Sequence, residues 1–250
     1  MGKSALLIES AFSCARRSYR VDLFSLEMNK QQVAARGISS ALKRNDMAVS
    51  YEAIYRREYK QEQVSHIRDA ARALPNINLD DTAGLTVSDI KARCLDKPGQ
   101  IDVIFIDYLN IMGLSDVKDV GRHDQQLGLV ASRLRNFAKD TGAAIVLLCQ
   151  LNRGSASRDN NVPMLHDLRD SGELEQHSDN VFFIHREHYY MKRKHDARMA
   201  AGDMPDMQER SELHALENVC NVIIAKQRMG RTGQVKLHCD MPYNVIRAAA

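Results

Sequence analysis

Uninterrupted apolar runs separated by helical stretches constrain the fold of this chain more than any other feature. Residues 101–107 form the clearest run, and it ends in an acidic residue. Residues 143–149, 181–185 and 219–225 are further runs of strand length. Runs of this kind, alternating with helices, are typical of a mostly parallel twisted sheet with helices on both faces. The sequence therefore predicts an α/β fold.

Helical periodicity and capping signals place helices between these strands. Thr86 followed by Asp89 has the spacing of a capping box, so a helix is expected over 86–95. The other expected elements are helices over 5–17, 28–44, 61–74 and 124–141, strands over 21–26 and 76–80, and an antiparallel edge over 235–239. Residues 187–212 are dense in charge and methionine, and we interpret them as an exposed insertion within a single domain over 1–250.

Composition excludes several classes of protein. Hydrophobic residues make up 44% and charged residues 27% of the 250 positions, as in ordinary globular proteins. The net charge of +3 is too small to indicate nucleic-acid binding by itself. The five cysteines are scattered and include no Cys-x-x-Cys pair, which favours a cytoplasmic location and no structural zinc. No apolar run has the length of a membrane span, so no membrane association is expected.

The first residues match the second half of a phosphate-binding loop, since Gly2, Lys3 and Ser4 form its closing Gly-Lys-Ser. Lys3 and Ser4 therefore indicate a nucleoside triphosphatase. The alternative is a tail that opens a helix with Ser4 as its cap, and a lone Gly-Lys-Ser favours this alternative. The rest of the motif and its strand would lie before residue 1, so we expect a sheet that lacks its first strand.

Two carboxylates follow expected strands. Asp107 ends the run over 101–107, where an acid can hold magnesium through water beside the loop serine. The alternative is an aspartate that caps the next turn. Glu27 follows the strand over 21–26 and could orient and deprotonate a water molecule. Taken alone, Glu27 is better interpreted as an acid at a helix N-terminus.

An amide and two basic residues also follow strands. Gln150 comes after the strand over 143–149, and an amide there can sense a terminal phosphate by hydrogen bonding. Lys226 and Arg228 leave the strand over 219–225 at positions i and i+2. Both side chains can reach one phosphate group from the same face of an extended segment. The alternative is a solvated basic hairpin.

These segments occur together, and their order is informative. They are 1–4, 24–28, 80–81 with 84–86, 106–109, 150–153, 167–172 with 175–176, and 226–228 before Gly230. In this order they resemble the C-terminal ATPase domain of the DnaB-type replicative DNA helicases, whose fold is RecA-like. The resemblance runs over nearly the whole chain.

The resemblance implies an ATP and Mg²⁺ site. Gly2 and Lys3 would contact the phosphates, and Ser4 would ligate the magnesium ion. Asp107 would hold that ion from the second shell. Glu27 would be the catalytic base, and Gln150 would report the state of the γ-phosphate to the DNA-binding loops.

The same resemblance implies roles for residues of the second half of the chain. Lys226 and Arg228 would reach the nucleotide of a neighbouring subunit, which requires a homo-hexameric ring. Arg186, directly after a strand, would pack on the base.

A DNA-binding loop is implied as well. The loop containing Arg169, Asp170 and Gly172 resembles the family's central-channel loop, which follows the backbone of single-stranded DNA. Arg169 can pair with a phosphate, and Gly172 lets the main chain approach closely enough to donate an N–H. Such contacts carry no base information, as a translocating motor requires. Residues 113–123 would form the other channel loop.

The implied function is that of a replicative DNA helicase motor driven by ATP hydrolysis. A primase and a helicase loader would be partners through an N-terminal region that this sequence does not contain. Two alternatives stay open at this point. One is another RecA-like ATPase, and the other is a catalytically silent fragment that binds DNA or other subunits.

Overall fold

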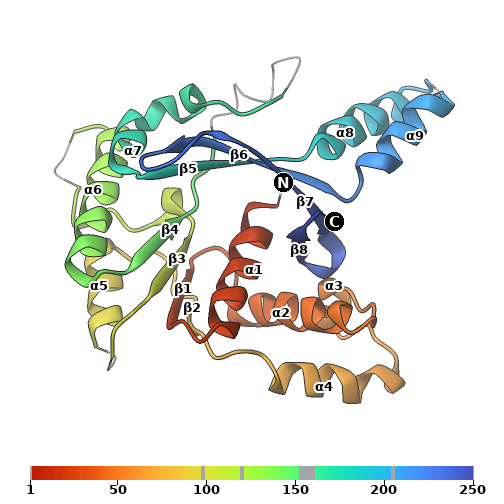
Figure 1. The fold of residues 1–250 in the computed structure, drawn as a ribbon, viewed down its shortest axis with the longest axis horizontal. Coiled ribbons are helices and arrows are strands. Elements are labelled where there is room, and N and C mark those ends of the chain that lie inside the picture. Colours follow the sequence, from red (N-terminus) through yellow and green to blue (C-terminus); the bar gives the residue numbers. More distant parts are fainter. Residues whose placement is uncertain (1, 97–98, 119–120, 152–160, 204–205, 250) are drawn as a thin grey trace.

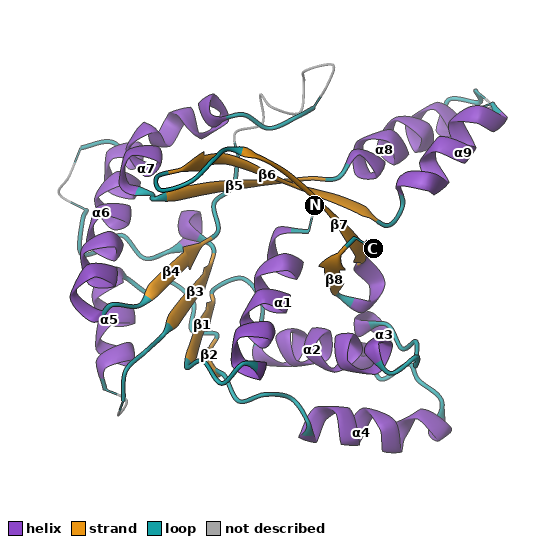
Figure 2. Ribbon diagram, viewed as in Figure 1, coloured by secondary structure: helices purple, strands orange, loops and turns teal. Residues whose placement is uncertain are grey.

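A computed structural model describes residues 2–96, 99–118, 121–151, 161–203 and 206–249 (Figure 1). Its strands form two four-stranded sheets, one parallel and one antiparallel. Figure 2 shows β5 and β6 crossing above the four parallel strands, with helices packed around the parallel sheet. The predicted α/β fold class is therefore confirmed.

The parallel sheet has the strand order β2-β1-β3-β4. Its strands are β1 (Val21–Ser25), β2 (Asn78–Asp80), β3 (Val103–Asp107) and β4 (Ala144–Leu147), all of which were predicted. Ser25 lies opposite Asp107, so β1 and β3 end at the same edge of the sheet. Every residue of β1 and β3 is buried, as expected for central strands of a covered parallel sheet.

Helices cover both faces of the parallel sheet, as predicted. They are α1 (Lys3–Arg16) and α2 (Lys30–Arg44) on one face, and α5 (Val87–Leu95) and α6 (His123–Thr141) on the other. Leu23 and Phe105 pack among side chains of α1 and α2. Phe24 and Ile106 pack among side chains of α5 and α6. Successive residues point to opposite faces of a strand, and this alternation builds the two cores.

The shorter helices were harder to predict. The expected helix over 61–74 begins with η1 (Gln61–Gln63) and continues as α4 (Val64–Arg72). The sequence did not predict α3 (Tyr51–Arg56), which is too short for a periodic pattern. Its start is marked by the Ser50 side chain, which accepts a hydrogen bond from the Ala53 N–H. The capping box of Thr86 and Asp89 at the start of α5 is confirmed.

The antiparallel sheet has the order β5-β6-β7-β8, which the sequence did not predict. Its strands are β5 (Asn180–His185), β6 (Val219–Gln227), β7 (Gly233–Asp240) and β8 (Val245–Ala248). The expectation that β5 and β6 continue the parallel sheet is wrong, because they pair antiparallel with each other. A turn joins β6 to β7, and such a short connection permits only antiparallel pairing. Beyond β7, η5 (Met241–Tyr243) leads to β8, so β7 is not the edge strand.

Residues 187–212, interpreted from the sequence as an insertion, contain much of a helical pair. Helix α8 (Glu187–Ala200) and helix α9 (Met207–Leu216) project away from both sheets (Figure 1). Neither helix has a buried residue. Arg198 joins them through ion pairs of 2.7 Å with Asp203 and Glu209.

Each sheet has two edge strands, β2 and β4 in the parallel sheet and β5 and β8 in the antiparallel sheet. Among the described residues, β4 pairs with β3 alone and β5 pairs with β6 alone. Both strands expose apolar side chains, with Val146 at 40% and Phe182 at 54% of full exposure. Within the described ranges, no helix is long and apolar enough to cross a membrane.

Candidate functional site

The start of α1 lies at the carboxyl edge of the parallel sheet, where ligands of α/β proteins bind. Gly2 precedes the helix with φ at 101°, a left-handed conformation that glycine adopts without strain. A Cβ at this position would also lie 3.1 Å from Met241 Cε. Both the backbone and the available space therefore favour glycine here. Ser4 does not cap the helix, because Gly2 is the N-cap and Ser4 lies within α1.

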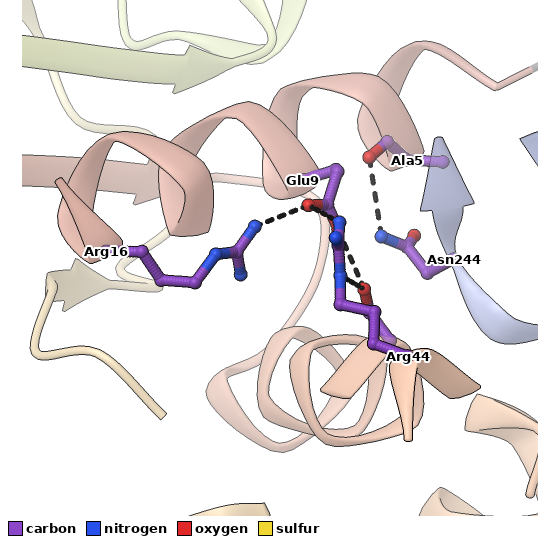
Figure 3. Close-up of polar contacts among 6 residues, drawn as sticks. Ala5, Glu9, Arg16, Arg44 and Asn244 are labelled. Atoms are coloured by element: carbon purple, nitrogen blue, oxygen red, sulfur yellow. Dashed lines mark hydrogen bonds and ion pairs between the residues drawn. The ribbon is translucent and has the colours of Figure 1, made fainter. Parts of the chain in front are cut away.

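Polar contacts hold α1 in this position (Figure 3). The buried carboxylate of Glu9 accepts hydrogen bonds from Arg16 (2.7 Å) and from Arg44 of α2 (2.6 Å). Its other oxygen accepts from Ser40 Oγ at 2.8 Å. At the other end of the helix, Asn244 Nδ2 donates to the Ala5 carbonyl at 3.4 Å. The helix is thereby tied to α2 and to the segment that precedes β8.

Lys3 lies at the end of β4. Its Nζ donates a hydrogen bond to the Cys149 carbonyl at 3.0 Å. Burial lowers the pKa of Lys3, while the neighbouring Cys149, Asp107 and Glu27 oppose that shift. The structure therefore brings Lys3 together with both carboxylates that the sequence singled out. A partly desolvated ammonium among acids is suited to neutralising a phosphate.

Asp107 and Ser4 meet at the end of β3. The Asp107 side chain accepts a hydrogen bond from Ser4, and the residue is 2% exposed. Burial raises the pKa of Asp107, and the charge of Glu27 adds to the increase. Asp107 Oδ2 is buried and has no hydrogen-bond partner among the described residues. A buried oxygen with unused acceptor capacity, next to a serine hydroxyl, fits a hard cation such as Mg²⁺.

Glu27 is exposed and follows β1. The interpretation of Glu27 as a helix N-terminal acid is wrong, because Asn29 caps α2 and the first turn of that helix has no acid. The Asn29 side chain accepts from the Gln32 N–H, which completes a capping box. Glu27 therefore does not cap α2. It lies close enough to Lys3 and Asp107 for its charge to shift their pKa values.

Gln150 is exposed at the end of β4, and a residue that the sequence did not single out positions it. Asn110 Oδ1 accepts from the Gln150 N–H at 3.2 Å. Asn110 belongs to η2 (Leu109–Ile111), which directly follows β3. An amide three residues after Asp107 was the available signal for this contact. Cys149 was likewise missed, since its contribution is a backbone carbonyl that no side-chain pattern reveals.

Arg186 also lies beside the start of α1. Its Cδ would be 3.8 Å from a Cβ built on Gly2, so the two residues are neighbours. Arg186 directly follows β5, and its Nη2 donates to the Glu217 carbonyl at 3.0 Å. Within the described part of the chain, its Nε is buried and has no hydrogen-bond partner. The antiparallel sheet thereby contributes a cation to the group around the phosphate-loop residues.

Lys226 and Arg228 have partners elsewhere. Lys226 Nζ donates to the Glu175 carbonyl, and Arg228 forms an ion pair of 2.9 Å with Asp179. Both Arg228 and Asp179 are about half exposed or more, at 48% and 59% of their side chains. The structure does not bring these two basic residues to Lys3 or Asp107 of the same chain.

The predicted DNA-binding residues lie in one short segment. Arg169 and Asp170 belong to η4 (Leu165–Ser171), and Gly172 begins α7 (Gly172–His177). The side chains of Arg169 and Asp170 lie outside the described part of the structure, as do residues Asn152 and Arg153. Asp167 fixes the start of η4, because its carboxylate accepts from the Met164 N–H at 2.8 Å.

Lys3, Ser4 and Asp107 therefore lie together at the carboxyl edge of the parallel sheet of an α/β fold. Residues 1–247 match the model of the DnaB-like helicase C-terminal domain family, and the chain belongs to that family. The alternative of a different RecA-like ATPase is thereby excluded.

Similar proteins agree with this assignment. A replicative DNA helicase DnaB of Rickettsia felis is 29% identical over 98% of this chain and 50% of its own length. Two solved structures have TM-scores of 0.80 and 28% identity over the full chain. One is an isolated ATPase domain, covered to 81%, and the other is a DnaB-like replicative helicase described with its primase interactions, covered to 55%. The chain spans about half the length of the curated relatives that it matches.

Proposed function

We propose that this chain is the motor domain of an ATP-driven replicative DNA helicase. In this proposal it acts in the cytoplasm as a homo-hexameric ring that translocates on single-stranded DNA. The observation that carries the proposal is the convergence of Lys3, Ser4 and Asp107 at one edge of the parallel sheet. Three residues from two distant segments lie together there, and phosphoryl transfer uses a lysine, a hydroxyl group and an acid of these kinds.

Lys3 supplies a positive charge for the phosphates. In the described structure its Nζ hydrogen bonds the Cys149 carbonyl, so a bound phosphate would compete with a neutral acceptor. An anionic oxygen is the stronger acceptor for an ammonium group. Lys3 is therefore held near its working position by a contact that ATP can displace.

Ser4 and Asp107 would hold Mg²⁺. The unpartnered Asp107 Oδ2 and the adjacent Ser4 hydroxyl give oxygen ligands of the type that Mg²⁺ binds. When bound, the ion neutralises charge on the phosphate oxygens. A cation would also reverse the effect of burial on Asp107, because it favours the charged carboxylate.

Glu27 would act as the general base. Glu27 is exposed, and its charge shifts the pKa values of both Lys3 and Asp107. A water molecule near the phosphates would therefore lie close to the Glu27 carboxylate. Arg228 and Lys226 would complete the site of the adjacent subunit. Their distance from Lys3 within one chain is compatible with that role, and half-exposed Arg228 is accessible to a neighbour.

Arg169, Asp170 and Gly172 would contact the DNA backbone, Arg186 would contact the base of ATP, and Gln150 would link the nucleotide to the loop that follows it. A primase is a proposed partner, by likeness to the helicase structure described with one. A helicase loader is proposed on the family resemblance alone.

ATP hydrolysis tests the proposal. Turnover is measured with and without single-stranded oligothymidine, and light scattering gives the particle mass. A version extended upstream by a strand and the first half of a phosphate loop is measured in parallel. We expect DNA-stimulated turnover from a hexamer-sized particle in at least the extended version, and its abolition by Glu27→Gln. Turnover that survives Glu27→Gln, or absence of turnover in both versions, contradicts the proposal.

A further inference from the structure

Two cysteines of the antiparallel sheet are cross-strand neighbours. Cys220 of β6 lies opposite Leu237 of β7, and the Cys239 N–H donates to the Asn218 carbonyl at 2.8 Å. Cys239 is therefore the diagonal neighbour of Cys220 and projects from the same face of the sheet. Each thiol shifts the pKa of the other, so the two sulfurs lie close together.

This thiol pair is enclosed. Both cysteines are 0% exposed, and both belong to a small apolar cluster with Ala5 and Ile246. Cys14 and Cys149 are less buried and lie in other parts of the molecule. Among the described cysteines, Cys220 and Cys239 are therefore the two whose thiols affect each other.

The pair also adjoins the candidate nucleotide site. Ala5, in the same cluster, belongs to the first turn of α1. Met241, which packs against the cluster, would contact any side chain at Gly2. Arg186 lowers the pKa of Cys239, so its guanidinium lies near that sulfur. Oxidation of these sulfurs would therefore change the surroundings of Arg186 and of the start of α1.

The surroundings make the two thiols chemically unequal. The neighbouring Cys220 thiol lowers the pKa of Cys239 to about 7, and Arg186 contributes in the same direction. The same contact raises the pKa of Cys220. A thiolate is the nucleophilic form of cysteine, so Cys239 is suited to attack and Cys220 to follow as a thiol.

We propose that Cys220 and Cys239 form a redox modification site that hydrogen peroxide oxidises to a cross-strand disulfide. The Cys239 thiolate attacks one peroxide oxygen, the O–O bond breaks, and hydroxide leaves, which gives a sulfenic acid at Cys239. The Cys220 sulfur then attacks the Cys239 sulfur and displaces the hydroxyl group, which leaves as water with the Cys220 proton. Two thiols are oxidised and one peroxide is reduced to two waters.

Access to the buried pair requires local opening. Strand β8 borders β7, and its last residues, Arg247 and Ala248, are exposed. An edge strand such as β8 opens at a lower free energy than a core strand. Peroxide is small enough to enter through such an opening. The chemistry of this site does not depend on the proposed helicase function.

Peptide mapping tests the proposal. The native 250-residue chain is treated with hydrogen peroxide, and remaining thiols are alkylated after denaturation. After trypsin digestion, we expect a disulfide-linked species that joins the peptides over 211–226 and 237–247 and that dithiothreitol separates. Thiol titration should show the loss of two of the five thiols. A folded chain, verified by circular dichroism, that yields no such species would overturn the proposal.

Two variants test the order of the steps, and a third serves as a control. In Cys220→Ser, a sulfenic acid at Cys239 should persist and be trapped by a 1,3-dione reagent. In Cys239→Ser, Cys220 should stay a thiol. The matched control Cys14→Ser should form the disulfide at the same rate as the unmodified chain. Trapping at Cys220 rather than Cys239 would overturn the assigned order, and should either variant fail to fold, the result on the unmodified chain decides alone.

Discussion

The two sheets of this molecule differ in what surrounds their strands. In the parallel sheet, β1 and β3 are buried at every position and end at the candidate nucleotide site. In the antiparallel sheet, β7 is exposed over its first half, and β6 is only partly buried over most of its length. The parallel sheet therefore provides a rigid frame for chemistry within one chain. The antiparallel sheet keeps basic residues near solvent, where another molecule can reach them.

The strongest test of this contrast is Arg228→Ala. In the proposed function Arg228 completes the site of a neighbouring subunit, so Arg228→Ala should lower turnover by about three to five orders of magnitude, as loss of an arginine finger does. Stability should change by less than about 1 kcal/mol, because the ion pair with Asp179 is half exposed. Steady-state ATPase assays and urea unfolding measure the two effects.

Mixing supplies the control for that prediction. Arg228→Ala mixed with Glu27→Gln should recover some turnover, since certain interfaces then hold both intact groups. Arg231→Ala, an exposed arginine in the same turn, should have little effect. If mixing never restores turnover, Arg228 does not act across an interface.

Substitution of one phenylalanine in each sheet compares how much the two sheets contribute to stability. Phe105→Ala in β3 should destabilise the chain by about 3–5 kcal/mol, because the ring is fully enclosed between α1 and the sheet. Phe182→Ala in β5 should change stability by about 0.5 kcal/mol or less, since that ring is 54% exposed. Urea denaturation of both variants compares the sheets directly, and equal losses would contradict the contrast.

Lys3→Ala should cost less free energy than Phe105→Ala, but it should clearly weaken nucleotide binding and turnover. Losing a charge-assisted hydrogen bond of about 1.5–3 kcal/mol should weaken binding to the phosphates roughly 10- to 150-fold. We expect turnover to be lost with it, while the fold survives. Isothermal titration with a non-hydrolysable ATP analogue gives the affinity. Lys30→Ala, at an exposed lysine, is the matched control, and equal effects of the two variants would remove Lys3 from the site.

The pH dependence of stability tests the environment of Asp107. Its pKa in the folded chain is raised by burial, so the folded state binds the proton more tightly than the unfolded state. The Asp107 contribution therefore favours folding at low pH. It is lost as pH rises from the unfolded pKa through the folded pKa.

Asp107→Asn removes this dependence. Relative to the unmodified chain without ligand, the variant should gain thermal stability as pH rises through that acidic window, then hold the gain. Thermal melts of both proteins from acidic to neutral pH measure the difference. Parallel melting curves at every pH would show that Asp107 is not desolvated as described.

The smallest effect is expected in the helical pair. Arg198→Ala removes the ion pairs that join α8 to α9, and both helices have no buried residue. We expect faster amide hydrogen exchange over 187–216 with an unchanged urea midpoint and unchanged ATP turnover. Slower turnover would show that the pair contributes to the site.

Much of this structure could be predicted from sequence because local patterns determine it. The apolar run ending in Asp107 and the capping box of Thr86 identify their elements without long-range information. Lys3 and Ser4 could be named because the phosphate-loop motif fixes residue types, and Asp107 could be named because it ends a buried strand. Sheet partnership could not be predicted, since an apolar run such as β5 has the same pattern in a parallel or an antiparallel sheet. The roles of the Cys149 carbonyl and of Asn110 depend on chain proximity, which a single sequence does not encode.

The open edges of β4 and β5 determine how the protein behaves in concentrated solution. Each edge presents a row of backbone N–H and C=O groups without partners in the described ranges, next to the exposed side chains of Val146 and Phe182. Such edges are templates for strand addition by any other chain. Turbidity of the purified chain should therefore rise steeply with protein concentration, and dilution during purification should preserve native material.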